Sequence, residues 1–337
     1  MNSENSYQGG SVQWHLGPVI EALRISREST HNIRHQGRVR ELPSRDVVRQ
    51  IVDGISAALF PTHYGRPDLN DESIDYFVAD TLNVALDRLV EQVRRSLRFS
   101  PDFSPDFSPD LSPDASSDAS SGSSSASASA SSAARDRTQD AVLAERARAI
   151  TREFAASLPR IRALLVSDVQ AALAGDPAAM SVAEIMLCYP GTIAILYHRI
   201  AHRLHQLNVP FLARVAADIG HSLTGIDIHP GAQIGASFFI DHGTGVVIGE
   251  TAILGERVRL YQAVTLGAKR FPVDDNGALV KGTPRHPIVE DDVVIYAGAT
   301  ILGRITIGAG STIGGNVWLT QSVPPGSNVS QAQMRNT

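Results

Sequence analysis

The chain has 337 residues, 43% of them hydrophobic, and a formal net charge of −5 at neutral pH. This length allows two or three structural regions, and the lack of a basic cluster in the sequence counts against nucleic acid as a partner. One cysteine, Cys188, excludes an internal disulfide framework, and its apolar surroundings predict a buried thiol. The sequence shows neither a signal peptide nor an apolar run long enough to cross a bilayer, so a soluble, cytoplasmic protein is expected.

The N-terminal segment 1–40 is polar and mixed, and we expect a flexible tail with at most one helix, around Pro18 to Arg27. Apolar residues then recur at spacings of three and four from Ser44 to Leu59 and from Asp71 to Leu97. This spacing places them on one face of a helix, so a helical region is predicted over residues 41–98.

A low-complexity segment follows this region. The tetrapeptide that begins at Phe99, Phe-Ser-Pro-Asp, returns at Phe103 and Phe107, and as Leu-Ser-Pro-Asp at Leu111, before a tract of Ser and Ala. Such a composition buries too little apolar surface to fold, so residues 99–137 are predicted to be a disordered linker. A recognition motif for a partner is the alternative interpretation.

Helical periodicity resumes at Thr138, stops at Gly175-Asp176-Pro177 and continues to Ser222, which predicts a helical domain over residues 138–223. Within it, three histidines share one helical face, a spacing that also occurs in metal sites. They are His198, His202 and His205. Arg199 stands where the zinc-protease pattern requires Glu, so packing and hydrogen bonding are the favoured roles of these histidines.

From Ile228 to Leu319 an aliphatic residue recurs at every sixth position, apart from two breaks. The thirteen register positions are Ile228, Ile234, Ile240, Ile248, Leu254, Leu260, Leu266, Val289, Ile295, Ile301, Ile307, Ile313 and Leu319. This period fits neither a helix nor an ordinary strand, and it is typical of the hexapeptide repeat of a parallel β-helix, in which three hexads form one coil of about 18 residues. We therefore predict an α+β protein, with an all-helical N-terminal domain followed by a left-handed β-helix over residues 224–325 and a C-terminal tail over residues 326–337.

The two breaks in the repeat indicate where the regular scaffold is interrupted. Ile248 follows Ile240 at the eighth position instead of the sixth, so two extra residues bulge there. Val289 lies 23 positions after Leu266, which corresponds to one regular coil of about 18 residues plus five further positions. An irregular arm is therefore predicted over residues 267–287. Interruptions of this kind often carry binding groups.

Polar residues that depart from the repeat gather near these breaks. They are Asp227, His229, Asp241, His242, Arg285 and His286. A histidine within reach of a carboxylate can remove a proton from a hydroxyl, because the carboxylate fixes the tautomer and stabilises the imidazolium. The separation of Asp227 and His242 along the chain is three positions short of one coil, so contact between adjacent rungs is plausible. The alternative is that these residues cap turns at the corners.

The tripeptide Gly267-Ala268-Lys269 opens the arm. Its backbone amides and one cation suit a phosphorylated or pantetheine-bearing ligand. Gly and Lys are also common at ordinary β-turns, which is the alternative interpretation.

Several stretches resemble serine O-acetyltransferases of the type with a longer arm. They are Gly175-Asp-Pro-Ala-Ala, Tyr189-Pro-Gly-Thr, Thr224-Gly-Ile-Asp-Ile-His-Pro-Gly-Ala, Ile240-Asp-His-Gly-Thr-Gly, Tyr261-Gln-Ala-Val-Thr-Leu-Gly, Arg285-His-Pro and Ile313-Gly-Gly-Asn-Val-Trp. The resemblance covers roughly Asp168 to Val323. It implies transfer of acetyl from acetyl-CoA, as cosubstrate and without a metal, to the hydroxyl of L-serine, which gives the cysteine precursor O-acetyl-L-serine.

The resemblance also implies roles for individual residues. His242 would be the general base and Asp227 its partner. Asp176 and Asp241 would engage the ammonium of the amino acid or line its pocket, and Arg285 with His286 would hold its carboxylate. An Arg fork suits a carboxylate and carboxylates suit an ammonium, so the charges agree with a zwitterionic substrate. CoA contacts would lie near Gly267, Ala268 and Lys269, although the compact loop of the enterobacterial enzymes is replaced here by a longer arm.

Other acceptors and other functions remain open at this point. The acceptor could be O-phospho-L-serine, a sugar or an amine. A metal hydratase could use His229, His242 and His286 between subunits, and an inactive scaffold is a third alternative.

Prisms of this type usually form trimers with sites between subunits, so a homotrimer or a dimer of trimers is expected. Relatives that dock into cysteine synthase end in Ile, whereas this sequence ends in Met334-Arg-Asn-Thr337, which counts against that complex. Feedback inhibition by cysteine follows from the resemblance alone.

Overall fold

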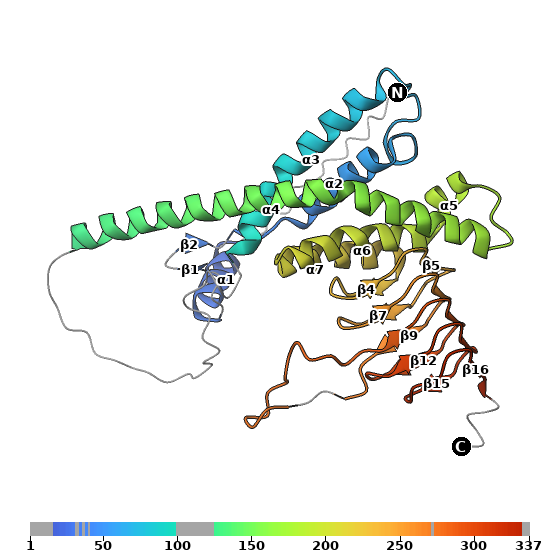
Figure 1. Ribbon diagram of the computed structural model, residues 1–337. Helices are drawn as coiled ribbons and strands as arrows, with labels where there is room; N and C mark the ends of the chain where they lie inside the picture. Colours follow the sequence, from blue (N-terminus) through green and yellow to red (C-terminus); the bar gives the residue numbers. More distant parts are fainter. Residues whose placement is uncertain are drawn as a thin grey trace, which may run out of the picture. The chain divides into compact units, whose positions relative to one another are not determined.

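Figure 1 shows a computed structural model of the chain, which describes residues 16–30, 34–35, 38–39, 41–98, 125–270 and 273–331. The chain divides into two compact units, Met1–Leu42 and Pro43–Thr337. The first unit holds α1 (Gly17–Thr30), where one helix was expected, and the antiparallel pair β1 (Arg34–His35) and β2 (Arg38–Val39). The repeats at residues 99–114 and the C-terminal residues 334–337 lie outside the described residues.

The helices of the second unit fall where the apolar spacing predicted them. They are α2 (Arg45–Leu59), the short π-helix η1 (Pro61–Gly65), α3 (Ile74–Leu97), α4 (Ser125–Gly175), α5 (Val182–Cys188), α6 (Pro190–Gln206) and α7 (Pro210–Thr224). α4 begins at Ser125, inside the segment predicted as a linker, and it runs through Pro159. Ala is the strongest helix former, so the Ser/Ala tract can continue a helix that the packed part of α4 nucleates. Among the described residues, no helix combines the length and apolar character needed to cross a bilayer.

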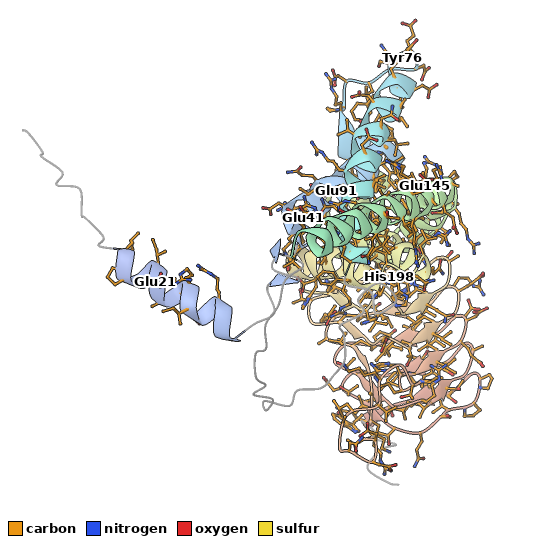
Figure 2. The ribbon with its side chains drawn as sticks, turned by 90° about the vertical axis from the view of Figure 1, so that its left-hand side faces the viewer. Glu21, Glu41, Tyr76, Glu91, Glu145 and His198 are labelled. Atoms are coloured by element: carbon orange, nitrogen blue, oxygen red, sulfur yellow. The ribbon has the colours of Figure 1, made fainter. Side chains whose placement is uncertain are left out.

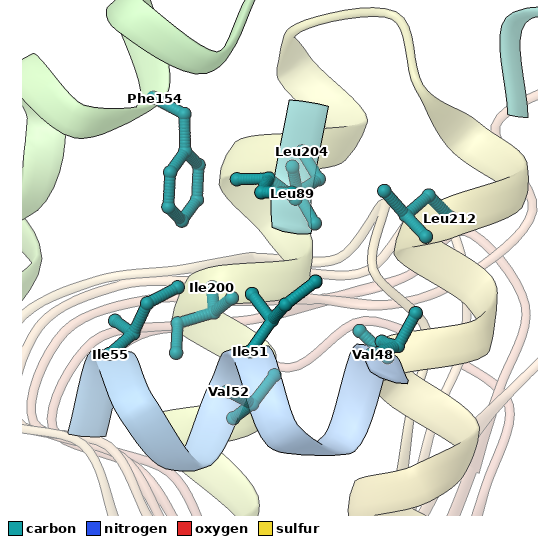
Figure 3. A pocket seen from close by; sticks show the side chains of 10 residues that line it. Val48, Ile51, Val52, Ile55, Leu89, Phe154, Ile200, Leu204 and Leu212 are labelled. Atoms are coloured by element: carbon teal, nitrogen blue, oxygen red, sulfur yellow. The ribbon is translucent and has the colours of Figure 1, made fainter. Parts of the chain in front are cut away.

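The helices pack around an apolar centre (Figure 3), whose lining residues are Val48, Ile51, Val52, Ile55, Leu89, Phe154, Ile200, Leu204, Leu212 and Ala216. They come from α2, α3, α4, α6 and α7, so these five helices share one core. The cavity left between them is about 10 Å³. That volume is at the lower limit for one water molecule and the lining is entirely apolar, so this space is packed core rather than a ligand site.

The rest of the second unit is a left-handed parallel β-helix whose coils stack from α6 and α7 towards β16 (Figure 1). Its strands are β3 (Asp227–Ile228), β4 (Gln233–Ile234), β5 (Phe239–Ile240), β6 (Val247–Ile248), β7 (Ile253–Leu254), β8 (Arg259–Leu260), β9 (Thr265–Gly267), β10 (Ile288–Val289), β11 (Val294–Ile295), β12 (Thr300–Leu302), β13 (Thr306–Ile307), β14 (Thr312–Ile313), β15 (Trp318–Leu319) and β16 (Asn328–Val329). All thirteen register residues are at most 9% exposed, so the hexad prediction of the core is confirmed.

The strands form three parallel faces, which we name by their first strand. The β3 face holds β3, β6, β9, β12 and β15; the β4 face holds β4, β7, β10 and β13; and the β5 face holds β5, β8, β11, β14 and β16. The sheet extends to β16, beyond residue 325, because Asn328–Val329 pairs with β14. Part of the segment predicted as a C-terminal tail therefore belongs to the prism.

Strand pairing defines both interruptions of the repeat. Asp227 pairs with Val247, two positions later than a regular coil would place its partner, which confirms two extra residues before β6. Leu266 pairs with Ile301, so the coil that contains the arm is almost twice as long as a regular one. The expectation of a full coil plus five positions is therefore wrong, because β9 and β10 lie on successive faces and the whole arm leaves from one corner.

A buried ion pair joins the helices to the first coil. The Arg199 guanidinium donates to both Asp168 carboxylate oxygens, with Nη2–Oδ1 at 3.0 Å, and to the carbonyls of Ile234 and Gly235. Asp168 also accepts from the backbone N–H of Phe238 at 2.9 Å. Both charged side chains are at most 5% exposed. The pair therefore fixes the turn that leads into β5.

Candidate functional site

The polar residues predicted for the site lie along two edges of the prism. The His242 edge is the corner where the chain passes from the β5 face to the β3 face, and it carries Asp241 and His242. The His286 edge is the corner from the β3 face to the β4 face, and it carries Arg285 and His286. The two sets therefore border the β3 face on opposite sides.

His242 projects from its edge, with 69% of its side chain exposed. Its Nδ1 lies 3.8 Å from Oδ1 of Asp241, whose side chain is 16% exposed. Asp227 stands at the start of β3, half-buried, and within the described residues no hydrogen bond or ion pair joins it to His242. The carboxylate within ion-pair distance of the imidazole in the protomer is therefore that of Asp241.

The backbone of His242 adopts a left-handed conformation, with φ of 57°. On this edge the regular corner places a left-handed residue three positions after the register residue, as at Ala263 and Asn316. After Ile240 that third position is Gly243, so His242 is an additional left-handed residue produced by the two-residue bulge. Such a conformation costs about 1–3 kcal/mol for a residue with a Cβ. The bulge therefore holds the imidazole outward at a local cost in stability.

Asp176 lies beside this edge, directly after the end of α4. Its carboxylate accepts a hydrogen bond from the Tyr189 hydroxyl at 2.5 Å and one from the Ala178 N–H at 2.8 Å. The pKa of Asp176 is lowered, chiefly by the phenol hydrogen bond, with smaller contributions from the charges of His242 and Arg259. Asp176 is therefore an ionised carboxylate within electrostatic reach of His242.

The His286 edge is held by a network around Thr251. The Thr251 hydroxyl accepts from the backbone N–H groups of Arg285 at 2.9 Å and His286 at 3.1 Å, and the Arg285 guanidinium donates to Glu250 at 2.5 Å. Nδ1 of His286 accepts from the Thr251 N–H at 3.0 Å, so the neutral ring carries its proton on Nε2. Burial, followed by the charges of Arg285 and Arg304, lowers the pKa of His286 to about 4.

Two further residues shape this edge. Gly249 leaves the space that the His286 ring occupies, because a Cβ at Gly249 would overlap the ring. His229 accepts from the Gly231 N–H at 3.0 Å, and burial lowers its pKa to about 4 with a smaller contribution from Arg214. Both imidazoles of this edge are therefore neutral, with His286 buried and His229 half-buried.

Comparison with known proteins gives the family. The Bacterial transferase hexapeptide (six repeats) family matches residues 286–321. The "Serine acetyltransferase, plasmid" of Synechococcus elongatus is 52% identical over 326 residues, which span 96% of this chain and 92% of that protein. The chain belongs to the serine acetyltransferase family. The serine acetyltransferase of Mycobacterium tuberculosis is 50% identical over 162 residues, 48% of this chain and 67% of that protein.

Solved serine acetyltransferases share the fold. The crystal structure of Entamoeba histolytica serine acetyltransferase 1 in complex with L-cysteine superimposes with a TM-score of 0.62 and 30% identity, over 85% of this chain and 97% of that one. Isoform 3 from the same organism, in complex with cysteine, gives a TM-score of 0.59 and 32% identity, over 92% of this chain and 89% of that one.

In this serine acetyltransferase the predicted CoA contacts also belong to the His286 edge. Gly267 ends β9, and its carbonyl accepts from the Gly303 N–H at 3.0 Å. Ala268 and Lys269 follow at the start of the arm, with Lys269 exposed. The edge with the buried His286 therefore also offers an accessible cation.

The histidine row on α6 is part of the packing. His198, labelled in Figure 2, is 2% exposed and stacks on His202 with ring centroids 5.5 Å apart. Neither of its ring nitrogens has a hydrogen-bond partner among the residues that the structure describes. Burial lowers the pKa of His198 well below its usual value. Within the ranges that the structure describes, no group of three His, Cys, Asp or Glu side chains could hold a metal ion. The prediction of a buried Cys188 is wrong, because α5 buries only Ile185 and Met186 and leaves the thiol exposed.

Three residues of the two edges were not predicted as individual contacts: Tyr189, Glu250 and Thr251. Tyr189 opens one of the stretches that resemble the family, and Glu250-Thr251 follow Ile248-Gly249 next to the bulge. Asp176 and Arg285, the partners of Tyr189 and Glu250, are distant from them in sequence. These pairs form through the fold, so the order of residues alone did not reveal them.

Proposed function

We propose that this enzyme transfers the acetyl group of acetyl-CoA to the hydroxyl of L-serine, giving O-acetyl-L-serine, a precursor of cysteine. The observation that carries this proposal is the 52% identity to a serine acetyltransferase over 96% of the chain. The site geometry supports it, because an exposed imidazole stands beside two carboxylates, Asp241 and Asp176.

In the proposed reaction, neutral His242 takes the proton of the serine hydroxyl as that oxygen attacks the thioester carbonyl carbon. A C–O bond forms, the C–S bond breaks, and the imidazolium returns its proton to the departing CoA thiolate. The nearby Asp241 carboxylate stabilises the imidazolium during this cycle. Asp227 is kept as the partner that the family motif implies, since it lies at the start of β3 on the same edge.

The zwitterionic substrate requires both edges. We assign the ammonium to Asp176 and Asp241, and the carboxylate to Arg285 and His286, whose Nε2–H is a donor. Because these two pairs border the β3 face on opposite sides, we propose that two neighbouring subunits of a trimer supply one pair each. The β3 face would then point towards the threefold axis.

Acetyl-CoA is assigned to the start of the arm. The exposed Lys269 offers a positive charge for a phosphate group, and Gly267 and Ala268 leave room for the pantetheine chain to approach the backbone. These residues share the edge of Arg285, so they would face the His242 edge of the neighbouring subunit. The thioester would then reach the general base across the subunit interface.

Chemistry removes one alternative acceptor. The side-chain oxygen of O-phospho-L-serine is already esterified, so it has no proton for His242 to take and cannot be acetylated in this way. A sugar or an amine acceptor would use the same scaffold, but neither explains Arg285 and His286 together with paired carboxylates on the facing edge.

The test combines an acetyl-CoA-dependent thiol-release assay with subunit mixing. Purified wild type should release CoA with L-serine and not with a simple sugar, and turnover only with a sugar would refute the acceptor. His242→Ala and Arg285→Ala should each be inactive when expressed alone. Coexpressed, they should regain activity, because some interfaces then pair an intact His242 edge with an intact His286 edge. Mixed trimers without any recovery would refute the shared site.

A further inference from the structure

Tyr189 connects two helices, but its hydroxyl bonds to a residue outside both of them. It ends α5 and directly precedes α6, with extended φ and ψ of −87° and 119°. Pro190 at the first position of α6 imposes this extended conformation on the preceding residue. The side chain makes no capping hydrogen bond to α6, and its hydroxyl donates instead to Asp176, which lies before α5 in the chain.

The hydrogen bond from Tyr189 is short and leaves the carboxylate partly free. The distance from the phenol oxygen to Oδ2 of Asp176 is 2.5 Å, and Oδ1 accepts from the Ala178 N–H at 2.8 Å. Each carboxylate oxygen has two lone-pair sites, so one site on each oxygen remains for a further donor. The phenol therefore fixes the orientation of the carboxylate without closing it to an ammonium group.

Packing brings this arrangement to the His242 edge. Gly191, in the first turn of α6, lies so close to the Ile240 carbonyl that a Cβ there would overlap it. Ile240 directly precedes Asp241, so the start of α6 rests on the end of β5. Accordingly, the nearby charges of Asp176, Glu184 and Asp241 contribute to raising the pKa of Tyr189 to about 12, after the hydrogen bond to Asp176 and burial.

We propose that Tyr189 is a positioning residue that selects the amino group of the acceptor, by holding Asp176 oriented towards the ammonium. This inference rests on the proposed function, because it assumes that Asp176 binds serine. Loss of the hydrogen bond between Tyr189 and Asp176 would weaken binding of the acceptor but not binding of acetyl-CoA, whose proposed contacts lie on the other edge. A merely structural role at the joint between α5 and α6 would disturb both substrates alike.

The test is Tyr189→Phe, which removes one oxygen and keeps the ring. We expect KM for serine to rise about tenfold, as for loss of a hydrogen bond to a charged group, with KM for acetyl-CoA and the melting temperature unchanged. Tyr76→Phe is the matched control, because Tyr76 is 81% exposed on α3. It should leave both KM values unchanged.

A double-mutant cycle separates positioning from packing. Asp176→Asn should raise KM for serine by itself, and adding Tyr189→Phe to it should have no further effect. An unchanged KM for serine in Tyr189→Phe, or an equal rise in the Asp176→Asn background, would overturn the inference. A wild-type enzyme that does not acetylate serine would instead refute the proposed function, so the two failures are distinguishable.

Discussion

The two edges that border the β3 face are built in opposite ways. On the His242 edge the imidazole is 69% exposed and the backbone beneath it is left-handed, with φ of 57°. On the His286 edge the imidazole is 7% exposed, and both Nδ1 and the backbone N–H are hydrogen-bonded to Thr251. One edge therefore presents an exposed imidazole, and the other holds its imidazole buried, neutral and hydrogen-bonded.

This difference fits the proposed site, in which each of two subunits would supply one edge. A general base has to reach the substrate and change its protonation state, so exposure in the isolated protomer suits it. A group that recognises a carboxylate gains from a fixed rotamer and tautomer, which Thr251 and Gly249 provide for His286. The comparison predicts that substitution of His242 acts on turnover, whereas substitutions on the His286 edge act on binding and stability.

The largest effect is expected from His242→Ala. Loss of a general base should lower kcat by about 10²–10⁴-fold. The melting temperature should change little, because the side chain that is removed is exposed. Steady-state kinetics and calorimetric titration with CoA test this, and CoA affinity should stay the same. His221→Ala, which removes an exposed histidine from α7, is the control and should keep full turnover. Normal turnover in His242→Ala would refute its assignment as the base.

A smaller effect is expected from Gly249→Ala, on the other edge. The added methyl group would overlap the His286 ring, so the ring or the backbone has to shift. Overpacking of this kind costs about 1–3 kcal/mol of unfolding free energy, and KM for serine should rise because His286 moves. Chemical denaturation and kinetics measure both quantities.

The double variant Gly249→Ala with His286→Ala tests whether overlap with the His286 ring causes the loss of stability. Removing the ring leaves space for the methyl group, so the double variant should be more stable than the sum of the two single variants predicts. Strictly additive losses would mean that the two residues do not share this space.

Much of the fold could be predicted from the sequence, because the six-residue period of aliphatic residues determines the β-helix. The thirteen aliphatic positions all lie in the core, since a coil cannot bury its own apolar side and every register residue has to face inward. The position of the arm was predicted, because it lies between β9 and β10, but its division into one coil plus five positions was wrong. The residue count between Leu266 and Val289 does not reveal which face each residue occupies. Strand pairing does, because it places Leu266 beside Ile301 and so assigns the whole arm to one corner.

The site was less predictable than the fold. Sequence spacing suggested contact between Asp227 and His242, but in the protomer the carboxylate within ion-pair distance of the imidazole is that of Asp241, its immediate neighbour. The roles of Arg285 and His286 came from the family resemblance, and within one protomer the β3 face separates these two residues from Asp241 and His242. Residue spacing defines positions along the coil, but a local bulge and the corner that each residue occupies decide which side chains meet within the protomer.

The smallest expected effect concerns the pH dependence of stability on the His286 edge. The pKa of His229 is lowered to about 4 in the folded protein, so the unfolded chain binds a proton that the folded chain does not as the pH falls below about 6.5. Stability attributable to His229 is therefore fully present above pH 6.5 and is lost as the pH falls towards 4. Between pH 7.5 and 5.5 the expected loss is about 1 kcal/mol. His229→Gln, whose amide oxygen can accept from the Gly231 N–H, should lose correspondingly less, as measured by urea denaturation at both values. Identical pH dependence in the two proteins would show that His229 titrates in the folded state as it does in the unfolded chain.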